Sequence, residues 1–261
     1  MRAVLRKTLT LKTDYKEPEC SSSNLRVQIK AAAINPVDYK LGWPIFGPIS
    51  GLDFAGVVDQ VGQNVKDFKV GDEVYGMADG SLADYAVVRP DKISHKPKSL
   101  TFPEAAALPV AYLTSYQALR VNGSLEGRKV IVIGASGGCG IAGVQLAKLM
   151  GASKIYGVCS GKNADLVKSL GVDEVIDYTK QNLLEYFKVA SDDLSDEDKI
   201  DLIYDTATGS GGGEDYLAQS KPLLFEGTNV EGGRRDGQVR YLKTDLMVCS
   251  CLNQSLLVCN Y

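Results

Sequence analysis

The segment VIVIGASGGCGIAGVQLAK, residues 130–148, combines three kinds of local sequence. It begins with a run of branched apolar residues, continues through a cluster of small residues and ends with apolar residues at helical spacing. A nearly continuous Val/Ile run is typical of a strand buried in a parallel sheet. The segment therefore predicts a buried strand that turns sharply, through residues with small side chains, into a helix.

The chain after this turn alternates between strand-like and helix-like stretches. Strands are expected at residues 129–133, 154–159, 174–176 and 200–205, and helices at residues 138–150, 164–170 and 183–189. Because strands that alternate with helices need crossover connections, this order is typical of a parallel sheet with helices on both faces. We therefore expect a doubly wound α/β domain in the second part of the chain.

The first part of the chain has short strand-like segments separated by Gly, Pro, Asn and Asp, as turns require. The segments are RVQIKAAAI, GLDFAGVVDQVG, GDEVYGMA and LADYAVVRP. Residues 1–15 alternate like a first strand, although their basic beginning also fits a transit peptide. We expect a mostly β, barrel-like domain over residues 1–116 and the α/β domain over residues 117–261, with the change in an Ala-rich helical segment.

The composition argues against several classes of protein. With 29 basic and 32 acidic residues and a net charge of −3, the totals do not indicate binding to nucleic acid, so a small soluble ligand is favoured. No apolar run approaches the roughly 20 residues that span a bilayer. Six cysteines without a C-x-x-C pair, and one histidine, do not suggest a disulfide framework or a zinc finger. A reducing, cytoplasmic location is expected, with an organelle as the alternative.

The small residues of the opening segment match a dinucleotide-binding loop. Ala135, Gly137 and Gly140 take the three small positions of the G-x-G-x-x-G pattern. Gly137 would let the backbone approach a pyrophosphate at the positive end of the helix, and Gly140 would let the helix pack on the strand. A plain strand-to-helix turn is the alternative. The residues expected to contact a dinucleotide here are Ala135, Ser136, Gly137, Gly138, Cys139 and Gly140.

The residues after the next strand bear on the choice between NADH and NADPH. NADH sites place an acidic residue about 20 positions after the glycines, on the ribose 2′-hydroxyl, but Ser160 stands there in VCSGKN. Ser160, Lys162 and Asn163 offer a hydroxyl, a cation and an amide, which suit a phosphate. The sequence therefore favours NADPH, unless Lys162 is merely a solvated residue at a helix start. Tyr178 is either near the same phosphate or a packed aromatic residue.

Several segments resemble those of one known family, in the same order. They are AAAINPVDYK, GLDFAGVVDQVG, VGDEVYG, GSLADYAVV, ALPVAYLTSYQAL, GASGGCGIAGVQLAK and KSLGVDEVIDY. Up to about Leu224 the chain resembles the zinc-independent, zeta-crystallin-like quinone oxidoreductases of the medium-chain dehydrogenase/reductase superfamily. The resemblance implies a GroES-like catalytic domain followed by a Rossmann NADP-binding domain, and NADPH-dependent reduction of quinones or α,β-unsaturated carbonyls.

The resemblance also implies roles for individual residues. Asn35, Asp38 and Tyr39 of NPVDY would line the substrate side, and Thr114 would lie near the nicotinamide. Asn35 would donate a hydrogen bond to the carbonyl oxygen, and Tyr39 would donate or relay a proton. For Asp38 a structural role in a turn is equally open.

The residues that bind catalytic zinc in zinc-bearing relatives are replaced here. A Cys of those relatives corresponds to Asn35, and their Gly-His-Glu corresponds to Gly51, Leu52 and Asp53. Catalytic zinc usually has three His, Cys or carboxylate ligands, and Asp53 alone makes no such site. No metal is therefore expected, so the substrate must itself be electrophilic, as quinones and enones are. The cofactor would supply the hydride and the protein the orientation.

The chain departs from the family after Leu224. The remaining residues end early and match poorly, although LMVCSC and LLVCNY have the composition of buried strands. Because the later half of the family's sheet lies beside the nicotinamide, two functions are expected. One is an NADPH-dependent reductase, and the other is a catalytically impaired, truncated protein that binds NADPH or a partner. The family also implies a homodimer formed through an edge strand of the Rossmann sheet.

Overall fold

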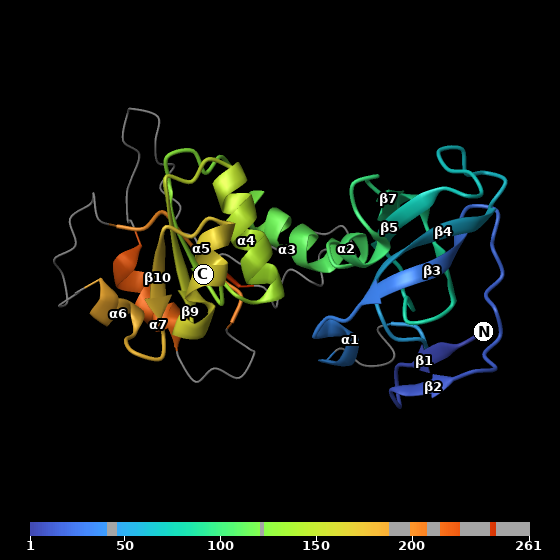
Figure 1. The fold of residues 1–261 in the computed structure, drawn as a ribbon, viewed down its shortest axis with the longest axis horizontal. Coiled ribbons are helices and arrows are strands. Elements are labelled where there is room, and N and C mark those ends of the chain that lie inside the picture. Colours follow the sequence, from blue (N-terminus) through green and yellow to red (C-terminus); the bar gives the residue numbers. More distant parts are fainter. Residues whose placement is uncertain (41–45, 121–122, 188–198, 208–214, 225–240, 244–261) are drawn as a thin grey trace. The chain divides into compact units, whose positions relative to one another are not determined.

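The computed structural model describes residues 1–40, 46–120, 123–187, 199–207 and 215–224, together with the backbone of residues 241–243. The chain divides into two compact units, Met1–Ala111 and Tyr112–Tyr261 (Figure 1). The division falls within helix α3 (Pro109–Arg120). The sequence places its domain change, after residue 116, in the same helix.

The first unit is built mainly of antiparallel strands. Strands β1 (Ala3–Leu5) and β2 (Thr10–Lys12) form a hairpin, so the alternating start of the chain is indeed strand. A five-stranded sheet has the order β6-β3-β4-β5-β7. Its members are β3 (Leu25–Ala33), β4 (Asp53–Val61), β5 (Glu73–Met77), β6 (Tyr85–Val88) and β7 (Ile93–His95). The core of this sheet contains Leu25, Val27, Phe54, Val58 and Val74, all at most 1% exposed.

The helices of the first unit are short and begin at polar or proline residues. Helix α1 (Val37–Lys40) follows β3. Helix α2 (Phe102–Ala106) begins with a capping box between Thr101 and Glu104, which satisfies two backbone N–H groups. Helix α3 begins at Pro109, because proline suits the first turn of a helix and disfavours helical backbone in the residue before it. The predicted helical segment is therefore two helices.

The second unit is a parallel sheet with the order β10-β9-β8-β11-β12. Its strands are β8 (Lys129–Ile133), β9 (Lys154–Cys159), β10 (Glu174–Asp177), β11 (Leu202–Asp205) and β12 (Tyr241–Lys243). The helices between and after them are α4 (Gly138–Leu149), α5 (Ala164–Leu170), α6 (Leu183–Tyr186) and α7 (Tyr216–Ser220). The predicted doubly wound fold is confirmed, whereas LMVCSC and LLVCNY lie outside the described residues.

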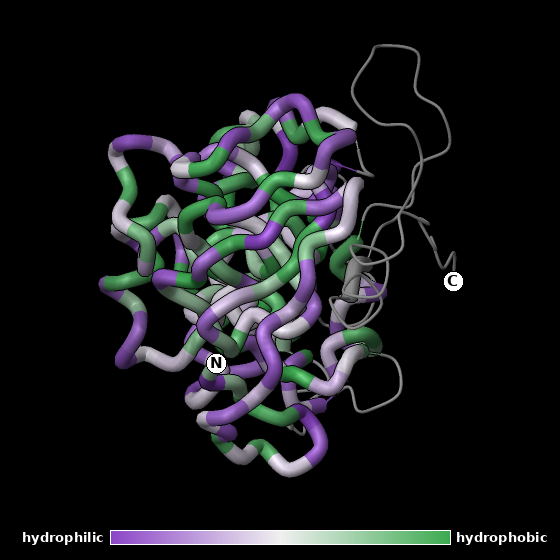
Figure 2. The backbone as a smooth tube through the Cα atoms, turned by 90° about the vertical axis from the view of Figure 1, so that its right-hand side faces the viewer, coloured by the Kyte–Doolittle hydropathy of each residue, from purple (hydrophilic) through white to green (hydrophobic). Residues whose placement is uncertain are grey.

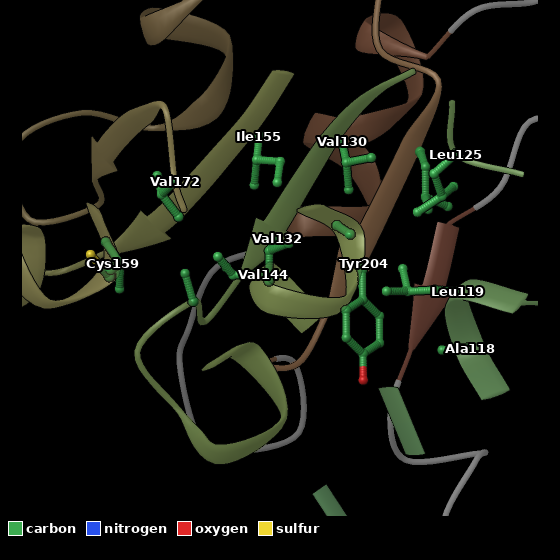
Figure 3. Packing of buried hydrophobic residues seen from close by; sticks show 14 residues of the cluster. Ala118, Leu119, Leu125, Val130, Val132, Val144, Ile155, Cys159, Val172 and Tyr204 are labelled. Atoms are coloured by element: carbon green, nitrogen blue, oxygen red, sulfur yellow. The ribbon is translucent and has the colours of Figure 1, made fainter. Parts of the chain in front are cut away.

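Alternate side chains of β8 enter two separate cores, which explains its unbroken apolar sequence. Val130 and Val132 pack in one core with side chains of α4 and α5, shown in Figure 3, and Ile131 and Ile133 pack in the other with side chains of α6 and α7. All four are fully buried. Each such side chain contributes roughly 1.5–3 kcal/mol when it leaves water, so β8 stabilises the packing on both faces of the sheet, as β9 and β11 also do.

The turn from β8 into α4 brings helix and strand unusually close together. Gly134, directly after the strand, has a φ of +74°, which favours glycine. A Cβ atom at position 140 would overlap the carbonyl oxygen of Gly134. Only glycine, which has no Cβ atom, avoids this overlap. Gly140 therefore permits the close packing of helix on strand that the sequence predicts for it.

Hydrophobic and hydrophilic residues are interspersed over short stretches of the backbone (Figure 2). Among the described residues, no helix has both the length and the apolar character needed to cross a membrane.

The two glycines of the α4 turn provide a matched pair of variants. In G140A the new methyl group meets backbone, so we expect a loss of about 1–3 kcal/mol in the free energy of unfolding. In G137A the methyl group lies 3.3 Å from the carbonyl oxygen of Gly134 at a φ of −81°, so stability is expected to change little. Urea denaturation followed by circular dichroism measures both, and equal stabilities would contradict the close packing described for Gly140.

Candidate active site

The predicted glycine loop lies at the carboxyl end of β8, where the strand order of the sheet reverses. Strand β9 is on one side of β8 and β11 is on the other, and ligands of doubly wound sheets bind at such a switch point. The N–H groups of Gly134 and Ala135 both donate to the carbonyl of Val158 in β9, at 3.0 Å. Ala135 and Gly140 are buried, Ser136 and Cys139 are half-buried, and Gly137 and Gly138 are exposed.

The exposed part of this loop is the N-terminus of α4. Gly137 is the N-cap residue and has no side chain with which to accept the N–H groups of the first turn. The first N–H groups of a helix lack partners within the helix and attract anions, with the helix dipole adding to the effect. A backbone without side chains, open to solvent at the start of a 12-residue helix, fits the pyrophosphate of a dinucleotide.

Three predicted phosphate-binding residues come together beside this helix N-terminus. The side-chain amide of Asn163 donates to the hydroxyl oxygen of Ser136 at 3.0 Å and lies 3.4 Å from that of Ser160. Ser136 belongs to the glycine loop, whereas Ser160 and Asn163 follow β9. Lys162 lies between them in a 3-10 turn (Gly161–Asn163) and is exposed. The structure thus gathers two hydroxyls and an amide, with a solvent-exposed cation in the same turn.

Tyr178 follows β10 and is 48% exposed, with its N–H directed to the carbonyl of Cys159 at 3.3 Å. The neighbouring Asp177 is an acidic residue at the end of β10. Its carboxylate accepts the hydroxyl of Thr179 at 2.7 Å, the N–H of Thr179 at 3.1 Å and the N–H of Gly161, which keeps the pKa of Asp177 below its usual value. This carboxylate is therefore engaged by the protein's own donors.

A hydrogen bond connects helix α3 to the first turn of α4. The hydroxyl of Ser115 donates to the carbonyl of Cys139 at 2.9 Å and lies 3.0 Å from the hydroxyl of Tyr204 in β11. The ring of Tyr204 occupies the space where Gly143 of α4 lacks a side chain. Thr114, predicted to lie near the nicotinamide, is fully buried, and its role stays a prediction.

Sequence reasoning did not include Thr206, which follows β11. Its hydroxyl donates to the carbonyl of Ile133 at 2.7 Å and lies 3.3 Å from the carbonyl of Gly134. These contacts place Thr206 beside the glycine loop. The available signal was its position after a predicted strand, because the carboxyl ends of neighbouring parallel strands meet at one edge of the sheet.

The predicted substrate-side residues lie in the first unit, around α1. The N–H of Asn35 donates to Oδ2 of Asp38 at 2.7 Å, and the side-chain amide of Asn35 donates to Oδ2 of Asp53 at 2.9 Å. Asp38 and Asp53 are 2% and 1% exposed. Oδ1 of Asp38 is buried without a hydrogen-bond partner among the described residues. Tyr39 is 59% exposed.

Burial dominates the ionisation of both carboxyl groups. It raises the pKa of Asp38 and raises that of Asp53 to about 7, against the opposing effect of the hydrogen bonds that each accepts. Oδ1 of Asp53 accepts the N–H of Val110, in the first turn of α3, at 3.0 Å. Asp53 is therefore a buried carboxyl group that bridges Asn35 and a helix N-terminus, and sequence reasoning considered it only as a remnant of a zinc site.

The residues at the zinc positions do not fit a catalytic zinc ion. Asn35 directs its amide N–H group, a donor, at Asp53, and Leu52 is an apolar residue that is 2% exposed. No group of three His, Cys, Asp or Glu residues with metal-binding geometry occurs in the described part of the chain. Zinc needs three or more donor ligands, which these positions do not provide.

Two family models match the chain, one within each of its two units. The "Alcohol dehydrogenase GroES-like domain" family matches residues 21–98, and the "Zinc-binding dehydrogenase" family matches residues 138–219. A 2-methylene-furan-3-one reductase of Solanum lycopersicum is 40% identical over 216 residues, covering 76% of this chain and 53% of the relative. An "NADPH-dependent alkenal/one oxidoreductase, chloroplastic" of Arabidopsis thaliana is 37% identical over 215 residues, with the same coverage. The chain thus spans about half the length of these curated relatives.

The chain is also similar to solved structures. The quinone oxidoreductase of Coxiella burnetii superposes with a TM-score of 0.73 at 30% identity, covering 87% of this chain and 73% of that chain. A GroES-like unit followed by a Rossmann unit with a glycine-rich loop defines a class of dehydrogenases. The chain belongs to the medium-chain dehydrogenase/reductase superfamily, as the sequence motifs indicate.

The raised pKa of Asp53 predicts a stability effect with a definite sign. Unfolded aspartate loses its proton near pH 3.8 and the folded group near 7, so the folded state retains an extra proton in between. The stabilisation is complete below about pH 4 and is lost as the pH rises through 7, by up to about 4 kcal/mol. D53N removes this dependence, so the stability of D53N relative to the wild type should increase from about pH 4 to about pH 8.

The measurement is urea denaturation of wild type and D53N across this pH range. The exposed Asp67 supplies the control, since D67N should follow the wild type at every pH. A constant difference between D53N and the wild type would mean that Asp53 ionises normally.

Proposed function

We propose that the chain is an NADPH-dependent reductase of quinones or α,β-unsaturated carbonyl compounds. The observation that carries the proposal is the cluster of Ser136, Ser160 and Asn163, with Lys162 in the same turn, beside an open helix N-terminus. NADPH differs from NADH by a 2′-phosphate, and a phosphate needs such donors and a cation. The names of the Arabidopsis and Coxiella relatives, an NADPH-dependent alkenal/one oxidoreductase and a quinone oxidoreductase, support the same cofactor and substrate classes.

In this proposal the residues of the second unit hold the cofactor. The N-terminus of α4 at Gly137 and Gly138 binds the pyrophosphate through backbone N–H groups, as does Cys139 in the first turn. Ser160, Lys162 and Asn163 bind the 2′-phosphate, and the exposed phenol of Tyr178 borders it. Ala135 and Gly140 shape the turn rather than touch the ligand, because both are buried.

The residues of the first unit act on the substrate. When bound, NADPH supplies the hydride. The amide of Asn35 donates a hydrogen bond to the carbonyl oxygen, on which negative charge develops. The carboxylate of Asp38 accepts the backbone N–H of Asn35 and so fixes the backbone at Asn35, just before α1. The exposed phenol of Tyr39 delivers a proton to the product.

Two further expectations stay predictions. The family implies a homodimer through an edge strand of the parallel sheet. A cytoplasmic location is expected, with an organelle as the alternative, and the Arabidopsis relative is named as chloroplastic.

The activity is tested by steady-state oxidation of NADPH, followed by its absorbance, with a panel of quinones and enones. Turnover above the rate in buffer is expected, and it should fall strongly when NADH replaces NADPH. Tight NADPH binding without turnover would instead favour the second predicted function, a catalytically impaired nucleotide-binding protein. Failure to bind NADPH would reject both.

Cofactor preference is tested at Lys162. A charge-assisted contact to the 2′-phosphate is worth about 1.5–3 kcal/mol, so K162A should weaken NADPH binding on the order of ten- to a hundred-fold and leave NADH binding nearly unchanged. Lys168, an exposed lysine of α5, provides the matched control K168A, which should alter neither. Fluorescence titration with both nucleotides measures the effect, and equal losses for NADPH and NADH in K162A would contradict the assignment.

A further inference from the structure

Asp53 connects two parts of the first unit that matter for the proposed chemistry. One carboxylate oxygen faces the side-chain amide of Asn35 at 2.9 Å, and the other accepts the N–H of Val110 at 3.0 Å. The group is 1% exposed, so water does not compete for these bonds. The orientation of the Asn35 amide therefore depends directly on whether Asp53 presents a hydrogen-bond acceptor or a donor to it.

The charged groups around Asp53 favour its neutral form. Asp38, in α1, acts on it electrostatically and adds to the effect of burial. Arg6 acts electrostatically on Asp38, and its guanidinium donates to the main-chain carbonyl of Asp38 at 3.4 Å and pairs with Asp79 at 3.2 Å. The strands paired with β4 place Ala33 and Met77 opposite Asp53, and neither residue titrates. The pKa of about 7 for Asp53 follows from these surroundings.

The two forms of Asp53 favour opposite orientations of the Asn35 amide. An ionised carboxylate only accepts hydrogen bonds, so Asn35 turns its NH₂ group inward, as in the structure. One of its two N–H groups is then held by Asp53, and its carbonyl oxygen lies on the other side. A protonated Asp53 has an O–H group that needs an acceptor. Rotation of the Asn35 amide by about half a turn supplies its carbonyl oxygen to Asp53 and turns the NH₂ group outward.

We propose that Asp53 is a positioning residue whose hydrogen bond determines whether Asn35 presents an amide donor or a carbonyl acceptor to the substrate. The inference rests on the proposed function, in which Asn35 donates to a substrate carbonyl oxygen. The acid form of Asp53 turns the donor outward and supports reduction, and the ionised form turns the acceptor outward and repels the carbonyl oxygen. Asp53 touches neither substrate nor cofactor in this scheme.

The D53N variant reproduces the acid form at every pH. An asparagine at this position has the same shape, accepts the N–H of Val110 with its oxygen and donates its NH₂ group to the carbonyl oxygen of Asn35. If Asp53 acts only as a structural support, D53N changes activity equally at all pH values. If it positions Asn35, D53N removes a pH dependence.

The experiment measures kcat/KM for a quinone at saturating NADPH between about pH 6 and about pH 8.5. In the wild type, kcat/KM should fall roughly 3- to 10-fold as the pH rises across this range, with an inflection near pH 7. This factor is the value of one hydrogen bond. D53N should hold the low-pH value throughout, and the exposed-site control D67N should behave as wild type. In N35A the inflection should disappear, and adding D53N to N35A should change nothing further. A flat wild-type profile, or an inflection that survives in D53N, would overturn the proposal.

A second measurement does not depend on activity. The side-chain amide signals of Asn35 in ¹⁵N-labelled protein, identified by their loss in N35A, should titrate near pH 7 in wild type and remain constant in D53N. If the chain binds NADPH but reduces no quinone or enone, the proposed function fails while these signals still decide whether Asp53 controls the Asn35 amide. Signals that do not titrate in wild type would refute that control.

Discussion

The close contact between the first turn of α4 and the end of β8 is the constraint on which the proposed nucleotide site depends. Gly140 has no side chain, so the helix lies directly against the carbonyl oxygen of Gly134. The same geometry leaves Gly137 exposed at the helix N-terminus. Packing and the proposed anion binding therefore come from one turn, in which small residues serve the fold on the buried side and the proposed cofactor on the exposed side.

The first unit buries carboxyl groups, which a core selected for stability alone would exclude. Asp38 and Asp53 are almost completely inaccessible, and one oxygen of Asp38 has no partner among the described residues. Burying polar groups costs free energy unless hydrogen bonds compensate. Only part of that compensation is present, through Asn35 and Val110. Such partly compensated carboxyl groups commonly occur at functional sites, and here both contact the residue proposed to bind the substrate carbonyl.

Local sequence was sufficient for most of the fold because its signals are short in range. The apolar run of β8 and the small residues after it predicted the strand, the turn and α4 with nearly their observed bounds. The break at Pro109 was not predicted, since a helical pattern continues through it, although proline itself was the signal. Asn163 and Ser136 were each proposed for the cofactor, but their mutual hydrogen bond joins residues 27 positions apart and has no local signature.

The sequence by itself determined the alternation of strands and helices, the glycine-rich turn after β8 and the replacement of the zinc ligands, because these follow from residue type and spacing along the chain. Only the tertiary structure decided the state of Asp53. A carboxyl group between Leu52 and Phe54 in a strand has no distinctive pattern, and its pKa is set by burial and by neighbours brought from α1 and α3. Solvent exclusion is a property of the folded chain, so the buried carboxyl group that contacts Asn35 becomes visible only when the strands and helices are packed together.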